Sequence, residues 1–374
     1  MKRVMYVRAN GIYSDSRATK EITALAKAGY DILVVGWDRE GDSDEKCKAV
    51  FNKYLEHIEI IMFKYQVKDR VGFKNIGKLF NWLRFVAETL KENLKTINVI
   101  HACNLDSILF CCGTCKKYGI KIVYDIFDYY IDAHISIPAI IRPLIEMMEI
   151  RIINSADITI ICTEERREQI AKAKPQKVIV IHNTPDVEMV STKLQYDYFY
   201  CGTFGVQRLI SEIFDGYDEN ADLKIGFAGY GIYKDRAIGL ASQYENFTYL
   251  GQIKYKECLD YEATAICLSA IYEPTIRNHR LCAPNKFYES LGLGKPVIVC
   301  RGTGIDRIVE ENNIGIVINY DVKEFYTAVR KLKDNPELCK EMGRRARQLY
   351  DDIYNWALME KILLDSYKEI ISTL

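Results

Sequence analysis

Short apolar runs alternate with amphipathic segments along the first half of the chain, and the two patterns have different periods. Runs typical of buried strands lie at Val4–Val7, Asp31–Gly36, His57–Phe63, Asn98–Ala102, Lys121–Tyr124, Asp157–Cys162 and Lys177–Ile181. Residues 16–28 and 138–154 have the apolar spacing of helices between such runs. The pattern predicts a parallel, doubly wound α/β sheet, in which ligands bind beyond the carboxyl ends of the strands.

The alternation breaks at residues 182–186 and then restarts. We predict that this tract, His-Asn-Thr-Pro-Asp, links a first domain, 1–184, to a second domain, 185–352. Strand-like runs in the second domain lie at Tyr198–Cys201, Lys224–Ala228, Phe247–Leu250, Ala265–Ser269, Val297–Cys300 and Gly315–Ile318. Residues 353–374 are expected to form a last helix, because their apolar residues recur at helical spacing.

The stretch 282–299 is the most informative part of the sequence. Pro284 stands where a helix would begin, and Gly292 ends that helix before the next strand-like run. A helix start offers unpaired backbone N–H groups and a partial positive charge, to which a phosphate can bind. Lys286 adds a full charge there, and Glu289, one turn further on, can accept hydrogen bonds from sugar hydroxyls. The stretch therefore predicts a site for a nucleoside diphosphate, although a ligand-free αβ turn has the same pattern.

Two runs in this stretch, Pro-Asn-Lys-Phe-Tyr-Glu (284–289) and Gly-Lys-Pro-Val-Ile-Val (294–299), resemble the nucleotide-sugar site of glycosyltransferase family 4. The resemblance implies the GT-B fold, an α/β architecture of two doubly wound, Rossmann-like domains that face each other across a cleft, with the last helix crossing back to the first domain. It also implies retaining transfer of a sugar from a nucleotide-diphosphate sugar to an acceptor hydroxyl, without a metal or other cofactor. In that family the glutamate at the place of Glu289 holds the donor ribose, whereas the family's second glutamate is replaced here by Leu281.

Further donor-side residues follow from the topology and from the resemblance. Gly11 and Arg17 come after the first strand, at the mouth of the sheet, and Gly11 could equally be a plain turn residue. Arg208, in the loop after Gly202, is the candidate for holding the donor diphosphate, with a surface arginine as the alternative. The predicted donor-binding set is Gly11, Arg17, Gly202, Arg208, Asn278, Arg280, Asn285, Lys286 and Glu289.

Four polar residues follow strands of the first domain at the edge where an acceptor would enter. His101 and Asp106 lie at the end of the fourth strand-like run, and Asp125 and Asp128 follow the fifth, where members of the family often place an acidic residue. One of them could orient the acceptor hydroxyl or take its proton. The alternatives are a histidine buried as a packing residue and carboxylates that only cap turns.

Composition narrows the class of protein. The chain has 374 residues, enough for two domains, and 51 basic against 51 acidic residues give no overall field that favours nucleic acid. Twelve cysteines without a paired framework, a start unlike a leader peptide and no apolar run of ~20 residues predict a cytoplasmic protein with reduced cysteines. The triplet Asp42-Ser43-Asp44 could chelate magnesium, but its polar surroundings favour a solvated loop.

The segment 64–95 is unusually basic, with eight lysines and arginines against three acidic residues and with aromatic residues between them. It could form an amphipathic helix that packs on its own sheet, or it could lie on an anionic membrane through Lys74, Lys78, Trp82 and Arg84, and the two arrangements can share the segment. Such a patch would suit an enzyme peripheral to the inner face of the cell membrane. The acceptor would then be a carbohydrate or lipid-linked saccharide, as in the synthesis of bacterial surface polysaccharide.

Two other functions fit the same residues. Because Leu281 replaces a family glutamate, the chain could bind a nucleotide sugar without turnover. A nucleotide-sugar 2-epimerase shares the architecture and would convert the donor with no acceptor present. We favour a glycosyltransferase, because a helix start, Lys286 and Arg208 are the fixed donors that a departing diphosphate needs.

Overall fold

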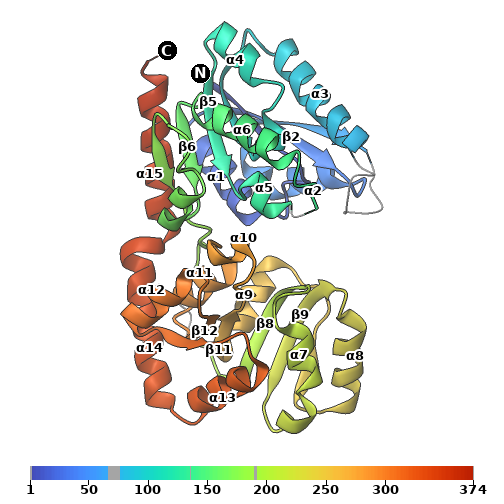
Figure 1. Cartoon of the computed structure of the whole chain (residues 1–374), viewed down its shortest axis with the longest axis vertical. Coiled ribbons are helices and arrows are strands. Elements are labelled where there is room, and N and C mark those ends of the chain that lie inside the picture. Colours follow the sequence, from blue (N-terminus) through green and yellow to red (C-terminus); the bar gives the residue numbers. More distant parts are fainter. Residues whose placement is uncertain (1, 66–75, 135, 189–191, 374) are drawn as a thin grey trace. The chain divides into compact units, whose positions relative to one another are not determined.

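The computed structural model describes residues 2–65, 76–134, 136–188 and 192–373, and its described chain forms two compact units (Figure 1). The first unit comprises Met1–His182 together with Ala357–Leu374, and the second comprises Asn183–Trp356. The sequence predicted boundaries at 184 and 352. The last helix therefore belongs to the same unit as the start of the chain.

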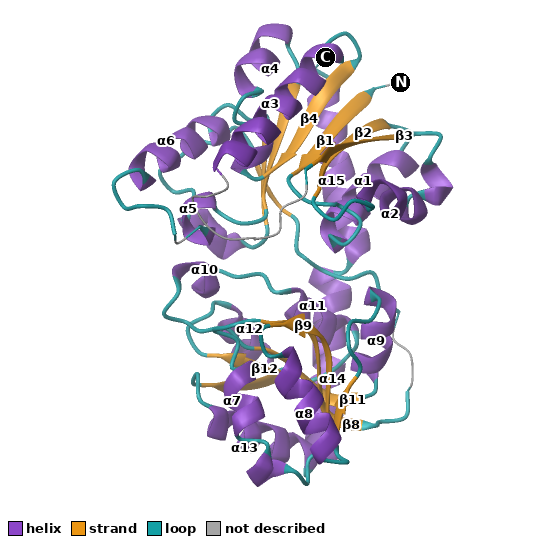
Figure 2. Ribbon diagram, turned by 90° about the vertical axis from the view of Figure 1, so that its right-hand side faces the viewer, coloured by secondary structure: helices purple, strands orange, loops and turns teal. Residues whose placement is uncertain are grey.

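The described part of the first unit contains a seven-stranded parallel sheet with the order β3-β2-β1-β4-β5-β6-β7 (Figure 2). Its strands are β1 (Arg3–Arg8), β2 (Asp31–Asp38), β3 (Ile58–Lys64), β4 (Ile97–Cys103), β5 (Lys121–Ile126), β6 (Ile158–Ile161) and β7 (Val178–Val180). Its α-helices are α1 (Ser16–Lys27), α2 (Ser43–Val50), α3 (Ile76–Glu92), α4 (Cys112–Tyr118), α5 (Tyr130–Ala133), α6 (Arg142–Ile153) and α15 (Trp356–Ile371). In β1, Met5 and Val7 join one core cluster, while Val4 and Tyr6 are equally buried and point to the opposite face. Both faces of the sheet are thus covered, as a doubly wound fold requires.

The second unit contains, in its described residues, a six-stranded parallel sheet with the order β10-β9-β8-β11-β12-β13. Its strands are β8 (Tyr196–Phe204), β9 (Ile225–Gly231), β10 (Phe247–Tyr249), β11 (Ala265–Ala270), β12 (Val297–Cys300) and β13 (Gly315–Ile318). Its α-helices are α7 (Ile210–Asp215), α8 (Lys234–Gln243), α9 (Tyr255–Ala263), α10 (Arg277–Arg280), α11 (Asn285–Gly292), α12 (Ile305–Asn312), α13 (Val322–Lys333) and α14 (Pro336–Leu349), the last followed by a π-helical turn, Tyr350–Tyr354. The prediction of two doubly wound units is confirmed.

Two glycines let neighbouring strands of the second unit pack closely. Gly229 and Gly231 lie within β9, with φ values of 135° and 146°. A Cβ on Gly229 would stand 1.8 Å from the carbonyl oxygen of Gly202 on β8, so these strands approach too closely for a side chain.

The prediction of a solvated loop at Asp42–Asp44 is wrong. Ser43 is buried, begins α2 and donates a hydrogen bond to Asp38 at 2.7 Å.

Cysteine pairing also differs from the prediction. Cys201 on β8 and Cys258 on α9 form a disulfide, whereas the other ten cysteines form no disulfide. The bond ties a central strand of the second unit to a helix that covers its sheet. A separate finding concerns membranes: no helix in the described ranges is long and apolar enough to cross a bilayer.

Candidate functional site

The start of α11 has the local geometry expected from its sequence. Pro284 is the N-cap, in an extended conformation with φ −72° and ψ 132°, so the helix begins one residue later than predicted. Asn285, the first helical residue, is exposed to solvent. Phe287 and Leu291 point into the protein, and both side chains are buried. The N–H of Phe287 donates to the carbonyl oxygen of the N-cap Pro284 at 3.0 Å. A helix start leaves the N–H groups before that of Phe287 without an acceptor in the helix, so those of Asn285 and Lys286 can bind an anion.

Lys286 lies between two carboxylates. Its Nζ is 2.6 Å from Oε2 of Glu289 on α11 and 2.7 Å from Oε1 of Glu262 on α9. Both glutamates are buried, with 1% and 0% of Glu289 and Glu262 exposed. The structure therefore brings Lys286 and Glu289 together as predicted, but the ammonium is directed at carboxylates of its own fold. Sequence reasoning missed Glu262, which lies on a different helix and carries no motif.

The charges in this cluster shift the pKa of two groups. Burial raises the pKa of Glu262 to about 8, and the neighbouring Lys286 only partly offsets this effect. Burial alone would lower the pKa of Lys286, but the charges of Glu262 and Glu289 outweigh it and leave the pKa raised. The raised pKa of Glu262 thus favours its neutral form, while the raised pKa of Lys286 keeps it charged beside Glu289.

Arg208 lies in a loop whose backbone is held in an uncommon conformation. Its neighbours Gln207 and Leu209 both have positive φ values, 66° and 61°. The loop is fixed from outside, because Glu273 donates its N–H to the carbonyl of Gln207 at 3.1 Å and Tyr320 accepts the N–H of Leu209 at 2.9 Å. Non-glycine residues in this region concentrate at functional sites, where strain is maintained by the surroundings.

The Arg208 guanidinium lies 5.0 Å above the ring of Tyr272. Within the described residues no ion pair joins Arg208 to a carboxylate. Gly202, at the end of β8, lies under the Tyr200 hydroxyl, which would stand 3.0 Å from an added Cβ. A substituted residue there would displace that hydroxyl.

The predicted sugar-flanking residues belong to the short helix α10. Asn278 is half-buried and Arg280 is exposed. His279 beside them contacts the carbonyl oxygen of Glu273 through Nδ1 at 3.1 Å. This contact links α10 to the same segment that fixes the Arg208 loop.

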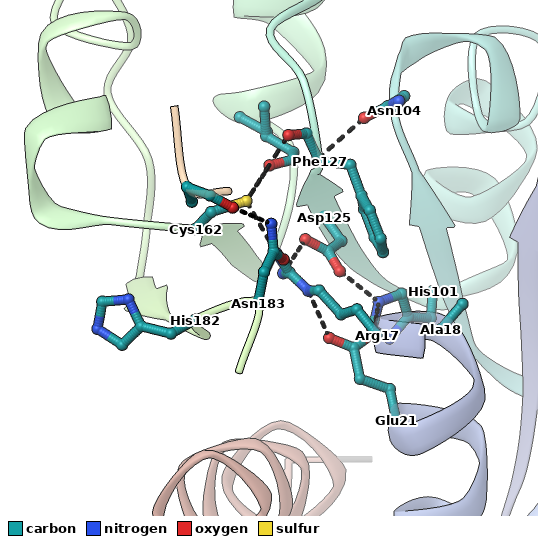
Figure 3. A network of polar contacts seen from close by, with 12 residues as sticks. Arg17, Ala18, Glu21, His101, Asn104, Asp125, Phe127, Cys162, His182 and Asn183 are labelled. Carbon is teal, nitrogen blue, oxygen red and sulfur yellow. Dashed lines mark hydrogen bonds and ion pairs between the residues drawn. The ribbon is translucent and has the colours of Figure 1, made fainter. Parts of the chain in front are cut away.

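In the first unit, Arg17 is the centre of a buried polar network (Figure 3). It is 3% exposed and forms ion pairs with Glu21, at 2.9 Å, and with Asp125. His101 lies between these carboxylates, with Nε2 3.4 Å from Asp125 and 3.5 Å from Glu21. The other ring nitrogen of His101 is 2.7 Å from the hydroxyl of Tyr367 on α15.

This network corrects the expected position of three predicted residues. Arg17, His101 and Asp125 were expected at the mouth of the sheet, but all three are buried and hydrogen-bonded to protein groups. They adopt this arrangement because the carboxylates and the guanidinium compensate each other's desolvation. Arg17 and Asp125 therefore lie inside the first unit, where they hold each other and the side chains around them in place.

Asp128 differs from Asp125, since 48% of its side chain is exposed. Its loop is held by Asn104, whose Oδ1 accepts the N–H groups of Phe127 and Asp128 at 2.9 and 3.2 Å. Asn104 has a positive φ of 68°, a conformation that asparagine tolerates better than most residues. Sequence reasoning missed this support.

Two further predicted residues occupy nearby loops. Asp106 is half-buried, and burial raises its pKa. Its carbonyl oxygen accepts a hydrogen bond from the Trp82 indole at 2.8 Å. Gly11 follows β1 at a place where a Cβ would lie 2.9 Å from both Ser43 and Tyr13, so its lack of a side chain is required by packing.

The predicted membrane patch is only partly at the surface. Lys74 lies outside the described residues, Lys78 is half-buried and Arg84 exposes 70% of its side chain. Trp82 is fully buried and stacks on Trp37 at 5.7 Å, so its assignment to the patch is wrong. The helical stripe of α3 packs on its own sheet, which was the alternative interpretation.

One group of side chains in the described chain could ligate a metal. The ligand atoms of His101, Cys103 and Asp125 lie within 4.8 Å of one another, and all three residues are buried. However, Arg17 already pairs with Asp125, and burial raises the pKa of Cys103 well above its ordinary value. A guanidinium and a neutral thiol suit a hydrogen-bonded network better than a cation site.

Comparison with known proteins agrees with this architecture. Residues 17–189 match the family model described as Glycosyltransferase Family 4, and residues 205–349 match the one described as Glycosyl transferases group 1. No curated protein matches the chain in sequence.

Solved structures resemble the whole chain. A sucrose-phosphate synthase from Thermosynechococcus elongatus is 13% identical, with 100% of both chains covered and a TM-score of 0.76. HepE from Anabaena in complex with UDP is 13% identical, covering 99% of this chain and 100% of its own, with a TM-score of 0.71. A glycosyltransferase from Rickettsia africae is 13% identical, with 99% and 98% covered and a TM-score of 0.68. At such identities the likeness shows the fold alone.

Proposed function

The chain belongs to the GT-B glycosyltransferases, with a family 4 first domain and a group 1 second domain, and we propose that it transfers its sugar with retention at the anomeric carbon. The donor is a nucleotide sugar.

The pairing of Lys286 with Glu289 at the start of α11 carries the proposed donor site. A buried carboxylate held by an ammonium is fixed in position and can accept hydrogen bonds from the ribose hydroxyls. The N–H groups of the first turn of α11 then bind the diphosphate, because that end of the helix is positive. HepE, a structural neighbour, was solved with UDP and with UDP-glucose, which supports a uridine nucleotide as the first candidate.

Arg208 supplies the charge that stabilises the departing diphosphate. Its loop is held in a strained conformation by Glu273 and Tyr320, and such a fixed cation needs little rearrangement when charge develops. With Arg208 and the helix start, the leaving group does not require a metal ion.

On the acceptor side we assign the carboxylate to Asp128. It is the more exposed of the two aspartates after β5, and Asn104 fixes the backbone that carries it. Asp128 would orient the acceptor hydroxyl or accept its proton. Asp125 supports this loop through its carbonyl oxygen, which accepts the N–H of Asn104 at 2.9 Å, and His101 contacts the Asp125 carboxylate.

The acceptor is proposed to be a lipid-linked saccharide at the inner face of the cell membrane. Phe80 and Phe110 are 56% and 41% exposed with ring centroids 5.5 Å apart, and Lys78 and Arg84 lie on the same helix as Phe80. An apolar pair beside cations suits an anionic membrane surface. Replacing Phe80 and Phe110 by Ser, with Arg84→Glu, should abolish sedimentation with vesicles that contain anionic lipid. Vesicles that never bind the unmodified protein would remove this part of the proposal.

Thermal unfolding with UDP, GDP, ADP and dTDP, with and without chelator, tests the donor site. A nucleotide at 100 times its Kd stabilises a protein by about 2.7 kcal/mol, which raises Tm by about 5–10 °C for a domain of this size. We expect one nucleotide to do so regardless of chelator, and Glu289→Ala to abolish the shift. Glu311→Ala, on an exposed position of α12, is the matched control. Indifference to all four nucleotides would overturn the assignment.

A further inference from the structure

Glu262 has no place in the proposed chemistry, yet it is buried against the donor-site lysine. It lies at the end of α9, and its Oε1 accepts a hydrogen bond from Nζ of Lys286 at 2.7 Å. Its other oxygen, Oε2, is buried and has no hydrogen-bond partner among the described residues. Burying a carboxyl group of which only one oxygen accepts a hydrogen bond lowers the stability of the fold, and Glu262 is 0% exposed. The hydrogen bond from Lys286 offsets part of this cost.

Lys286 is consequently unsuited to act as a mobile phosphate ligand. An ammonium has three N–H donors, and here Glu262 and Glu289 accept two of them at 2.7 and 2.6 Å. Two contacts from different helices fix the position of Nζ, because α9 carries one acceptor and α11 the other. Nζ in turn fixes one oxygen of Glu289 and leaves the other for a ligand.

The charge balance supports the same arrangement. Burial raises the pKa of Glu262 and favours its protonated form, so the charge of Lys286 is directed mainly to Glu289, 2.6 Å away. The groups that face Glu262 are Lys286 and Glu289 on α11, with Cys258 on its own helix. A protonated Glu262 still accepts the hydrogen bond through its carbonyl oxygen, so it holds Lys286 without competing for its charge.

We propose that Glu262 is a positioning residue of the donor site, which acts through Lys286 to hold the carboxylate of Glu289 in the orientation that selects ribose hydroxyls. This inference rests on the proposed function, because it takes Glu289 as the ribose ligand. It assigns Lys286 to the support of Glu289 and leaves the diphosphate to the helix start and Arg208.

The test measures discrimination between nucleotides that differ by one hydroxyl. Calorimetric Kd values are compared for UDP, GDP, ADP and dTDP against their 3′-deoxy counterparts, and for the first three also against their 2′-deoxy counterparts. Loss of a charge-assisted hydrogen bond should weaken binding to the native protein about 10-fold or more. In Glu262→Ala we expect this ratio to fall below about 3-fold, because Lys286 and Glu289 lose their fixed geometry. Glu262→Gln should keep the native ratio, since its amide oxygen replaces the acceptor of a protonated carboxyl.

Three controls make the outcome decisive. Asp260→Ala, at an exposed position of the same helix, should leave the ratio unchanged. In a Glu289→Gln background, Glu262→Ala should change the ratio no further, because both act on one contact. If Glu262→Ala does not fold, Glu262→Asp replaces it in the test, because the shorter side chain moves the acceptor away from Lys286 by one methylene. A native ratio in these Glu262 variants overturns the inference alone, whereas failure of the native protein to bind any nucleotide overturns the proposed donor site as well.

Discussion

Removal of the Cys201–Cys258 disulfide should selectively destabilise the second unit. The bond joins residues that are 57 positions apart in the sequence, both within that unit. In the chain-entropy treatment, a crosslink that closes a loop of this length lowers the entropy of the unfolded chain by about 14 cal/mol/K, or about 4 kcal/mol at 25 °C. We therefore expect the double variant Cys201→Ser, Cys258→Ser to lose about 4 kcal/mol of unfolding free energy in the second unit.

Hydrogen exchange followed by mass spectrometry separates the two units, which a global unfolding curve does not. Peptides from β8 and β9 should exchange about 1000-fold faster in the double variant, as about 4 kcal/mol implies, while peptides from β1 and β4 should not change. Cys112→Ser, at a free and partly exposed cysteine of the first unit, is the matched control.

A thiol count tests the premise directly. Denatured protein should show ten reactive thiols before reduction and twelve afterwards, because ten cysteines are free and two are paired. Twelve thiols without reductant, or unchanged exchange of β8 in the double variant, would refute the reasoning.

Three other predictions concern single residues. Asp125→Asn should lower the unfolding free energy of the first unit by about 3–5 kcal/mol in denaturant titrations, because it breaks a buried pair, whereas Asp128→Asn should keep stability but lower kcat. Burial raises the pKa of Glu149 from 4.5 to about 8, so its stabilising effect is complete below pH 4.5 and is lost as pH rises through 8. Glu149→Gln should flatten this pH dependence of Tm, and a variant with the native slope would contradict the assignment. Gly229→Ala should yield an unfolded second unit by circular dichroism, because its Cβ would overlap the carbonyl of Gly202.

The sequence predicted elements whose signals are local. The helix at 285–292 could be located because a proline, an apolar stripe and a glycine act within a few residues of one another. Lys286 and Glu289 could be paired for the same reason, since they are three residues apart on that helix.

What could not be predicted depends on contacts between distant residues. Glu262 is 24 positions from Lys286, and a glutamate on an amphipathic helix ordinarily faces solvent. Trp82 looked suitable for a membrane surface, but its indole N–H finds the carbonyl of Asp106, which lets the ring be buried. The burial of Arg17 likewise depends on Asp125, which is 108 positions away.

These buried pairs change where the positive charge of the donor site comes from. Arg17 and Lys286 were both candidates for binding the donor, but carboxylates of their own units compensate the charge of each. Arg17 pairs with Asp125 and Glu21, and Lys286 pairs with Glu289. A cation compensated in this way contributes little to the stabilisation of charge on a leaving diphosphate. Arg208 differs, because its described contacts are with the ring of Tyr272 and with Tyr200, neither of which is a carboxylate that would compensate its charge. We therefore propose that the strained loop that presents Arg208 and the N–H groups at the start of α11 provide most of the stabilisation of the diphosphate. The proposal follows from the positions of the carboxylates in the fold.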